Sequence, residues 1–335
     1  MLIVRPIKND DGEDFNNFAA ATGVGHTNLP NHPTQLTQKI NHSELSFASS
    51  VGHAGEEGYT FVMEDTLANR LVGTCTVDAT VGLSQPYYTY RVDQVTHSSI
   101  DLKINNRIPA LHINHDYTGA SRLSSFYLEP DYRCDFYDQL LSKSRLLFMA
   151  CFPERFAATT IAEMKGVIGS DGVSPFWESV GRHFFTMDFN EADLLTTSSN
   201  KHFIANLMPR YPLYVPLLSD KAQAVIGQHH DDVEDIVNIL EHEGLHFEGH
   251  VDIFDAGPIL EVRTRHLRAI RHAEQAQALI GDEVLHGKRV LVCNNSCLDF
   301  RCIIARKQGL SLVLSAGQID GLKVATGDTL TYCQL

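Results

Sequence analysis

The chain has 335 residues, of which 43% are apolar, so it is long enough to form two or three domains with buried cores. Its 41 Asp and Glu residues outnumber its 27 Lys and Arg residues, which gives a formal net charge of −14. This charge argues against a nucleic-acid-binding protein and against one that binds membrane surfaces through basic residues, because both present positive potential to phosphate groups.

Neither a membrane span nor a signal peptide is predicted. The longest apolar run, residues 146–152, is far shorter than the ~20 residues of a membrane-spanning helix. The N-terminus soon becomes acidic, so we expect a cytoplasmic protein. The seven cysteines are odd in number and scattered, which favours reduced thiols. Cys293, Cys297 and Cys302 lack the paired CxxC pattern of a zinc knuckle, so we expect them to be structural.

The first half of the sequence predicts a sheet with flanking helices. Acidic N-cap candidates at residues 10–14 begin a helix that runs to about residue 21, and residues 22–30 predict a loop. Residues 83–120 are expected to be irregular. The other predicted elements are strands at 2–5, 122–130, 158–167 and 183–189, an antiparallel hairpin of 59–65 with 71–82, and helices at 137–151 and 174–181.

From about residue 190 the composition changes and predicts a second α/β unit. The predicted elements are helices at 220–228 and 232–243, strands at about 246–254 and 258–263, and a connecting helix within 264–286. Short strands and glycine turns then predict a small β-barrel-like subdomain. We therefore divide the chain into three domains, 1–190, 191–286 and 287–335.

Residues 242–246, HEGLH, match the HExxH pattern, in which two histidines one helical turn apart bind zinc and the glutamate activates water. This chemistry requires the motif to lie within a helix. Gly244 instead stands where a glycine is expected to end a helix, and an alternating strand pattern follows it. His246 would then lie on the strand, so we predict no metal site, and a zinc metallohydrolase is kept as the alternative of a different class.

Two further histidine groups are also compatible with simpler interpretations. His229 and His230 precede two aspartates, but adjacent residues rarely converge on one metal, and a polar loop between helices explains them. His112 and His115 lie near Asp116, where a solvated or hydrogen-bonded histidine is more common than a metal ligand.

The order of the predicted elements resembles the plan of the Gcn5-related N-acetyltransferases, in which a turn and an amphipathic helix follow the fourth strand. In that superfamily the turn presents backbone N–H groups and a helix N-terminus to the pyrophosphate of coenzyme A. Residues 128–133, LEPDYR, resemble the strand end before this turn. Residues 174–185, SPFWESVGRHFF, resemble a late helix of the superfamily.

Longer stretches extend a resemblance across the whole chain: GHTNLP (25–30), YTFVMED (59–65), LVGTCTV (71–77), DYTG (116–119), LLSKSRLLFMA (140–150), AEMKGVIGSDGVSPFWESVGRHFFTMDF (162–189), IANLMPRYPLY (204–214), VIGQHH (225–230) and EGLHFEGHVDIFDAGPILE (243–261). They are similar to the arginine N-succinyltransferase family of bacterial arginine catabolism. The resemblance implies an α+β fold, with a Gcn5-related N-acyltransferase-like mixed sheet flanked by helices. It also implies a second, degenerate acyltransferase-like half and a small C-terminal β-rich subdomain.

The resemblance also implies the site residues. His230, at the end of VIGQHH, matches the family's general-acid histidine, whereas His229 does not match. Phe126 matches a position that binds succinyl-CoA, and Leu128 and Arg133 belong to the coenzyme-binding segment. The guanidinium of the substrate needs carboxylates, for which the candidates are Asp116, Glu163 and Asp252.

The implied reaction uses succinyl-CoA as co-substrate and needs neither a metal nor a covalent enzyme intermediate. The deprotonated α-amine of L-arginine attacks the thioester directly, while a backbone N–H near Phe126 polarises its carbonyl. His230 protonates the departing thiolate. Ornithine is the other candidate acceptor. We expect a homo-oligomer or a hetero-oligomer with a paralogous subunit.

One segment departs from the family pattern. The usual Arg-x-x-Gly-x-Gly turn stands here as residues 133–138, RCDFYD, without either glycine. Phe136 and Asp138 bring bulk and negative charge to the backbone that pyrophosphate should approach. The α-type chains of two-subunit family members share this feature, so the alternative within the family is a non-catalytic or regulatory subunit that needs a partner.

Overall fold

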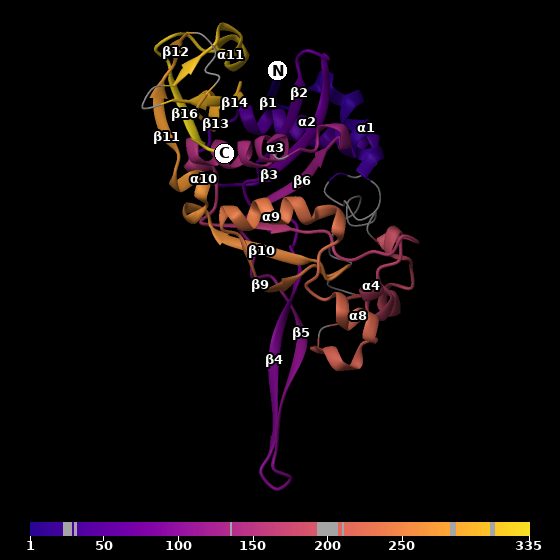
Figure 1. The fold of residues 1–335 in the computed structure, drawn as a ribbon. Helices are drawn as coiled ribbons and strands as arrows, with labels where there is room; N and C mark the ends of the chain where they lie inside the picture. Colours follow the sequence, from indigo (N-terminus) through magenta and orange to yellow (C-terminus); the bar gives the residue numbers. More distant parts are fainter. Residues whose placement is uncertain are drawn as a thin grey trace.

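The computed structural model describes residues 1–22, 29, 32–134, 136–192, 207–209, 211–281, 286–308 and 312–335. Within these ranges one 14-stranded sheet runs through the molecule (Figure 1). Its strands, in spatial order, are β11 (Glu274–Gln277), β16 (Thr329–Gln334), β13 (Lys288–Cys293), β14 (Cys302–Lys307), β1 (Leu2–Pro6), β2 (Gly58–Asp65), β3 (Arg70–Asp78), β6 (Ser121–Leu128), β7 (Thr159–Glu163), β10 (Pro258–Arg263), β9 (His246–Val251), β4 (Thr89–Ser99), β5 (Ile104–Asn114) and β8 (Leu213–Tyr214). The predicted mixed α+β class is confirmed.

Helices cover both faces of the first half of the sheet. Along β2 the side chains alternate, so that Val62 packs with α1 (Gly12–Thr22) and α2 (Pro33–Ala48), whereas Phe61 packs on Phe148 of α3 (Tyr137–Cys151). The predicted strands at 2–5, 59–65, 71–82 and 122–130 are present, as are the helices that begin near residues 12 and 137. The sequence analysis did not predict α2.

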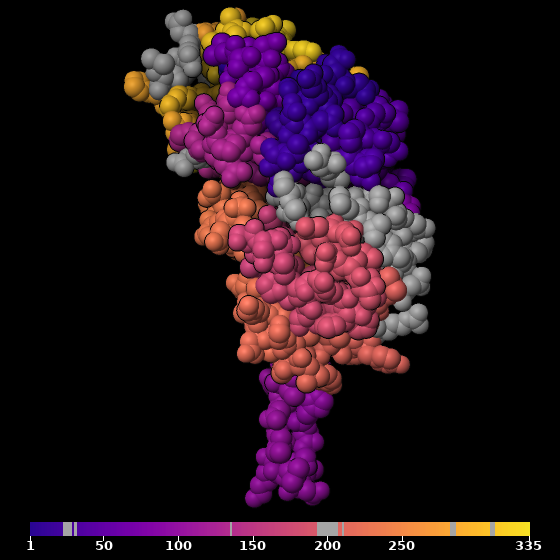
Figure 2. Space-filling model, turned by 90° about the vertical axis from the view of Figure 1, so that its right-hand side faces the viewer, coloured from indigo at the N-terminus to yellow at the C-terminus, as the bar shows by residue number. Residues whose placement is uncertain are grey.

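The expectation that residues 83–120 are irregular is wrong. Strands β4 and β5 pair from Thr89↔Asn114 to Ser99↔Ile104 and form a long hairpin that projects from the body of the molecule (Figures 1 and 2). Both faces of its outer part meet solvent, and Ile100 at its tip is 95% exposed. A strand without a buried face needs no apolar alternation, which is why the sequence carried no signal for it.

Two further elements differ from the prediction. Residues 181–185 form a short helix, α5 (Gly181–Phe185), in place of the start of a strand, because Phe185 packs against Trp177 of α4 (Pro175–Ser179). The expected connecting helix at 264–286 is instead the one-turn α10 (Arg268–Arg271), followed by β11 and β12 (Leu279–Ile280). Pairing of β11 with β16 overrides the helical composition of this segment.

The second half contains the predicted helices and strands around residues 220–263: α8 (Asp220–Val225), α9 (Glu234–Glu243), β9 and β10. The C-terminal segment is β-rich, as predicted, and also contains β15 (Val313–Leu314) and α11 (Ala316–Leu322). Its strand β14 pairs with β1 and so joins the large sheet. The boundaries at 190 and 286 stay a prediction.

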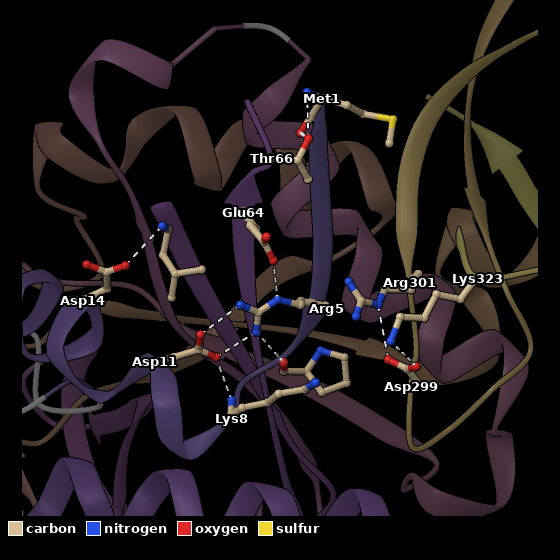
Figure 3. Close-up of polar contacts among 12 residues, drawn as sticks. Met1, Arg5, Lys8, Asp11, Asp14, Glu64, Thr66, Asp299, Arg301 and Lys323 are labelled. Atoms are coloured by element: carbon tan, nitrogen blue, oxygen red, sulfur yellow. Dashed lines mark hydrogen bonds and ion pairs between the residues drawn. The ribbon is translucent and has the colours of Figure 1, made fainter. Parts of the chain in front are cut away.

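A polar cluster ties the N-terminal strand to its neighbours (Figure 3). Arg5 of β1 donates hydrogen bonds to Asp11 at 2.7 and 2.8 Å and to Glu64 of β2 at 2.5 Å. The carboxylate of Asp14 accepts the backbone N–H of Leu71 at 3.2 Å, which anchors α1 to β3. None of the helices in the described ranges combines the length and apolar character that crossing a bilayer requires.

Candidate active site

The two parallel strands at the centre of the sheet separate after a short ladder. Within the described residues, β6 and β7 pair only over Ser121–Leu123 and Thr160–Ala162. Beyond this point no ladder joins the remaining residues of β6 to Glu163 or to residues 164–166, which follow β7. We call this region the β6–β7 opening, and it exposes backbone groups that a continuous sheet would use internally.

A bulge in β6 marks the opening. The register with β3 shifts between Thr76↔Ser124 and Thr74↔Tyr127, so Ser125 and Phe126 lie opposite one residue, and Ser125 has a left-handed φ of +53°. The buried guanidinium of Arg145 supports the bulge from α3 by donating to the carbonyls of Thr76 and Ser124 at 2.9 and 3.0 Å. A left-handed serine held this firmly is typical of a functional position.

His230 reaches the same opening from a distant part of the sequence. Its backbone N–H donates to the carbonyl of Lys165 at 2.8 Å, and His229 forms a bridge with Gly166. The N–H of Met164 donates to the carbonyl of Pro258 in β10. Because backbone groups of successive residues in an extended chain point in opposite directions, the carbonyl of Lys165 points away from β10, toward the side from which β6 has separated. The segment that contains His230 therefore lies in the β6–β7 opening with Phe126.

The imidazole of His230 is oriented by its own turn. Nδ1 accepts the backbone N–H of Asp232 at 3.1 Å, and a carboxylate oxygen of Asp232 lies 3.3 Å from the same nitrogen. In the neutral ring the proton must then be on Nε2, which has no hydrogen-bond partner among the described residues. With 25% of its side chain exposed, the ring presents an N–H donor to a bound molecule. His229 differs, because its Nδ1 contacts the carbonyl of His230.

Glu163 lies at the end of β7 in a charged cluster. It accepts a hydrogen bond from Arg122 at 3.1 Å and from the Tyr87 hydroxyl at 2.5 Å, and Arg122 also pairs with Asp78 at 2.9 Å. Burial, together with the charge of Glu163, raises the pKa of Tyr87 well above its usual value. The carboxylate of Glu163 thus already has a cationic partner within the protein.

Asp252 and its neighbour Asp255 shape the loop beside Glu163. Asp252 accepts the backbone N–H groups of Phe254 and Asp255, and Asp255 accepts those of Gly166 and Gly257 at 2.7 and 2.8 Å. Burial raises the pKa of Asp252 well above its usual value, and the charges of Asp255 and Glu163 add to the rise. Both carboxylates therefore stabilise the conformation of the loop.

A hydrogen-bonded chain that no sequence pattern indicated begins at Asp116. The carboxylate of Asp116, 50% exposed, lies 3.3 Å from Nε2 of His250, and Nδ1 of His250 lies 3.0 Å from the Tyr117 hydroxyl. Tyr117 in turn donates to Glu261. His250 stood inside a quoted family stretch, but its contact with Asp116 depends on strand pairing that the sequence does not display.

Two backbone N–H groups of the glycine-less turn before α3 are bonded within the turn itself. The N–H groups of Tyr137 and Asp138 both donate to the carbonyl of Cys134, at 3.0 and 3.4 Å. Burial raises the pKa of Asp138 to about 6, with Asp235 of α9 adding to the rise, while a hydrogen bond from the N–H of Cys134 opposes it. The guanidinium of Arg289 lies over the ring of Phe136, with its Cζ atom 3.6 Å from the ring centroid. The amides of Tyr137 and Asp138 are thus already bonded within the turn.

The other proposed coenzyme residues are Leu128 and Arg133, and α3 carries two further cations nearby in sequence, Lys143 and Arg145. Leu128 is fully buried, and its carbonyl accepts the Arg133 Nε–H at 3.2 Å, so only its backbone faces this segment. Lys143 and Arg145 are buried in the core, where Lys143 pairs with Glu243 at 2.9 Å. Of these cations only Arg133 remains accessible to a phosphate.

The HEGLH segment has the structure that the sequence analysis predicted. Helix α9 ends at Glu243, Gly244 follows with a φ of +106°, and His246 begins β9. His242 contacts Arg268, and Glu243 also accepts the backbone N–H of Ala269 at 2.6 Å. Across the described ranges, no three His, Cys, Asp or Glu side chains gather as a metal site would require. All seven cysteines are free thiols.

Comparison with known proteins gives one consistent result. A family model for the arginine N-succinyltransferase beta subunit matches residues 2–269. The chain is 40% identical to an arginine N-succinyltransferase of Yersinia enterocolitica and 38% identical to one of Escherichia coli; each alignment covers all of this chain and 98% of the relative. A solved structure of arginine/ornithine succinyltransferase subunit AI from Pseudomonas aeruginosa matches with a TM-score of 0.92 and 38% identity, covering all of this chain and 98% of that one.

Proposed function

The chain belongs to the arginine N-succinyltransferase family of N-acyltransferases, and we propose that it transfers the succinyl group of succinyl-CoA to the α-amine of L-arginine. The family match does not favour a non-catalytic subunit or a zinc hydrolase. The observation that supports the chemistry is that the His230 segment pairs with Lys165 and Gly166 beyond the end of β7, where β6 with its Ser125–Phe126 bulge has separated from β7.

The proposed reaction begins when the thioester lies along the bulge. A backbone N–H beside Phe126 donates to the thioester carbonyl and stabilises the negative charge that develops on its oxygen. The neutral α-amine attacks the carbonyl carbon, the C–N bond forms, and the C–S bond of the tetrahedral intermediate breaks. The amine loses its extra proton, and the CoA thiolate gains one.

His230 is the proposed donor of that second proton. A neutral ring cannot supply this proton without becoming an imidazolate, so the proposed acid is the imidazolium, with a proton on each ring nitrogen. Its Nδ1 lies 3.3 Å from the Asp232 carboxylate, and its Nε2 has no hydrogen-bond partner among the described residues. The Nε2 proton passes to the departing sulfur, and the ring is left neutral with its remaining proton on Nδ1.

The acceptor guanidinium is proposed to contact Asp116 in preference to the other candidates. Asp116 is half exposed, and among the described residues its carboxylate lies 3.3 Å from His250 and 3.9 Å from Arg91. Glu163 shares its charge with Arg122, so we assign it to shaping the acceptor site. Asp252 accepts hydrogen bonds within the loop beside β7, so we do not propose that it contacts the guanidinium.

For the coenzyme we propose contacts from Phe126, from the backbone of Leu128 and from Arg133. Because the amides of Tyr137 and Asp138 are bonded within the turn before α3, they contribute little to pyrophosphate binding. We further propose that the enzyme works in the cytoplasm, without a metal, as a homo-oligomer or with a paralogous subunit, and that ornithine is the acceptor to compare with arginine.

Release of free thiol tests the function. The purified chain is incubated with succinyl-CoA and arginine, then with ornithine, and each assay is repeated with any co-encoded paralogue added. Thiol release that depends on arginine, with succinylarginine identified by mass spectrometry, is the expected result. A chain that releases no thiol under any of these conditions contradicts the proposal.

A further inference from the structure

A lysine from the first half of the chain faces the bulge at the β6–β7 opening. Lys39 lies on α2, and its Nζ donates a hydrogen bond to the Ser125 hydroxyl at 2.8 Å. Ser125 is the left-handed residue of the bulge and immediately precedes Phe126. Arg145 holds the same bulge from the opposite face of the sheet. The ammonium group is therefore placed one residue from the position proposed for the thioester.

The charges around Lys39 make it suited to an anion. Among the described residues, the charges of Asp78 and Arg122 also act on Lys39, and Arg122 itself pairs with Asp78 at 2.9 Å and with Glu163 at 3.1 Å. Burial lowers the pKa of Lys39 to about 8, and Arg122 adds to the lowering while Asp78 opposes it. A bound carboxylate would offset part of the free-energy cost of burying the ammonium group, because an opposite charge stabilises the ammonium form.

The donor substrate carries a matching group. A succinyl group differs from an uncharged acyl group in ending with a carboxylate, which lies about 4 Å from the thioester carbon along bonds of ~1.5 Å each. A site that selects succinyl must therefore present a cation or several N–H and O–H donors one side-chain length from the thioester. Lys39 and the Ser125 hydroxyl form such a pair.

Resting on the proposed function, we infer that Lys39 and Ser125 form the subsite for the terminal carboxylate of the succinyl donor and so determine acyl specificity. The ammonium pairs with the carboxylate and the serine hydroxyl donates a hydrogen bond to it. The clamped bulge fixes both groups relative to the thioester. Lys39 thereby distinguishes a dicarboxylic acyl group from a monocarboxylic one of the same length.

The test compares succinyl-CoA with butyryl-CoA, which has the same number of acyl carbons and a methyl group in place of the carboxylate. Lys39→Met keeps the length of the side chain and removes its charge. We expect kcat/KM for succinyl-CoA to fall about 10- to 100-fold, as for loss of a charged hydrogen bond, so that the succinyl-to-butyryl ratio falls with it. Lys39→Arg should retain part of the preference, and Lys288→Met, at the exposed first residue of β13, is the matched control.

Equilibrium titration of each variant with the two acyl-CoAs, without arginine, gives a readout that does not need turnover. The same loss of selectivity should appear in Kd. If Lys39→Met does not fold, Ser125→Ala removes only the hydroxyl and should lower the ratio several-fold. Equal losses for both donors, or an unchanged ratio, would overturn the inference. Failure of the parent chain to release thiol from succinyl-CoA contradicts the proposed function instead, so the two results are distinct.

Discussion

The HEGLH segment and the β6–β7 opening differ in two respects: how recognisable they are in the sequence, and how available their polar groups are in the structure. HEGLH is a recognisable motif, yet every described polar group that it offers is used internally: Glu243 is 1% exposed and neutralised by Lys143, and His242 contacts Arg268. The opening has no compact motif, yet segments far apart in the sequence border it: the bulge that contains Phe126, the segment that contains His230 and, through Ser125, Lys39. A functional site needs backbone groups and side chains that are available to a ligand, and tertiary structure determines which groups are available.

The largest effect on activity is expected at His230. His230→Ala removes the proposed proton donor and should lower turnover by about 10²- to 10⁴-fold. His229→Ala is the neighbouring control and should lower it only mildly, because His229 contacts the carbonyl of His230 and not the leaving group. Thiol-release kinetics and circular dichroism of both variants make the comparison. Equal losses in two folded variants would remove the acid role from His230.

On the HEGLH side the large effect is expected on stability. Lys143→Met leaves the buried carboxylate of Glu243 without its cation, which should cost about 3–5 kcal/mol of unfolding free energy. The control is Arg182→Ala, which removes an exposed pair with Glu178 four residues away and should cost less than about 1 kcal/mol. Urea denaturation measures both. A small loss for Lys143→Met would mean that Glu243 is neutralised by another group.

These contrasts explain what the sequence could and could not predict. Apolar alternation and N-cap residues located β2, β3, β6, α1 and α3, because those elements have one buried face. The β4–β5 hairpin lacks that signal, and packing on Trp177 and pairing with β16 decided α5 and β11. At the site, His230 was found through the family resemblance. Lys39 and His250 were not, because only the folded sheet brings them to the bulge and to Asp116.

The coenzyme turn gives the next effect in size. Phe136→Gly with Asp138→Gly restores the family pattern, frees Arg289 from the Phe136 ring and removes a like charge. We expect succinyl-CoA to bind the double variant about 10- to 100-fold more tightly, since repulsion and crowding of this kind cost ~1–3 kcal/mol. Calorimetric titration decides. Tight binding by the parent that weakens in the variant would show that the present turn has its own working geometry.

Asp138 also predicts a pH dependence. Its pKa is about 6 in the folded chain against an ordinary value of 3.8, so the folded state holds the proton more tightly than the unfolded state. This carboxyl therefore contributes a loss of stability as the pH rises from about 4 to about 6, and Asp138→Asn lacks that contribution. Because the group is partly solvated, the variant should gain only about 1 kcal/mol above pH 6 and nothing below pH 4. Unfolding titrations at pH 4, 5, 6 and 7 follow the difference, and a constant offset across that range would contradict it.

The smallest effect should come from the residues that look most catalytic. His246 begins β9, where its ring lies 2.9 Å from Glu248 and contacts the carbonyl of Gly244, and His242 lies on α9 beside the exposed Arg268. Gly244, with a φ of +106°, turns the chain between them, so the two rings do not share one helical face as zinc ligands of this motif must. Replacing both by glutamine keeps hydrogen-bonding capacity at exposed positions. Acyl transfer should therefore stay within about twofold of the parent, in line with ordinary surface substitutions.

Chelation separates this expectation from the hydrolase interpretation. EDTA should leave thiol release unchanged, and the purified protein should contain no stoichiometric zinc. The His242→Gln, His246→Gln variant and the parent should respond alike, because the Glu243 carboxylate that would activate water is bound by Lys143 and Ala269 inside the core. Inhibition by EDTA that zinc reverses in the parent but not in the variant would mean that HEGLH rearranges to bind a metal, and the contrast between the two regions would then fail.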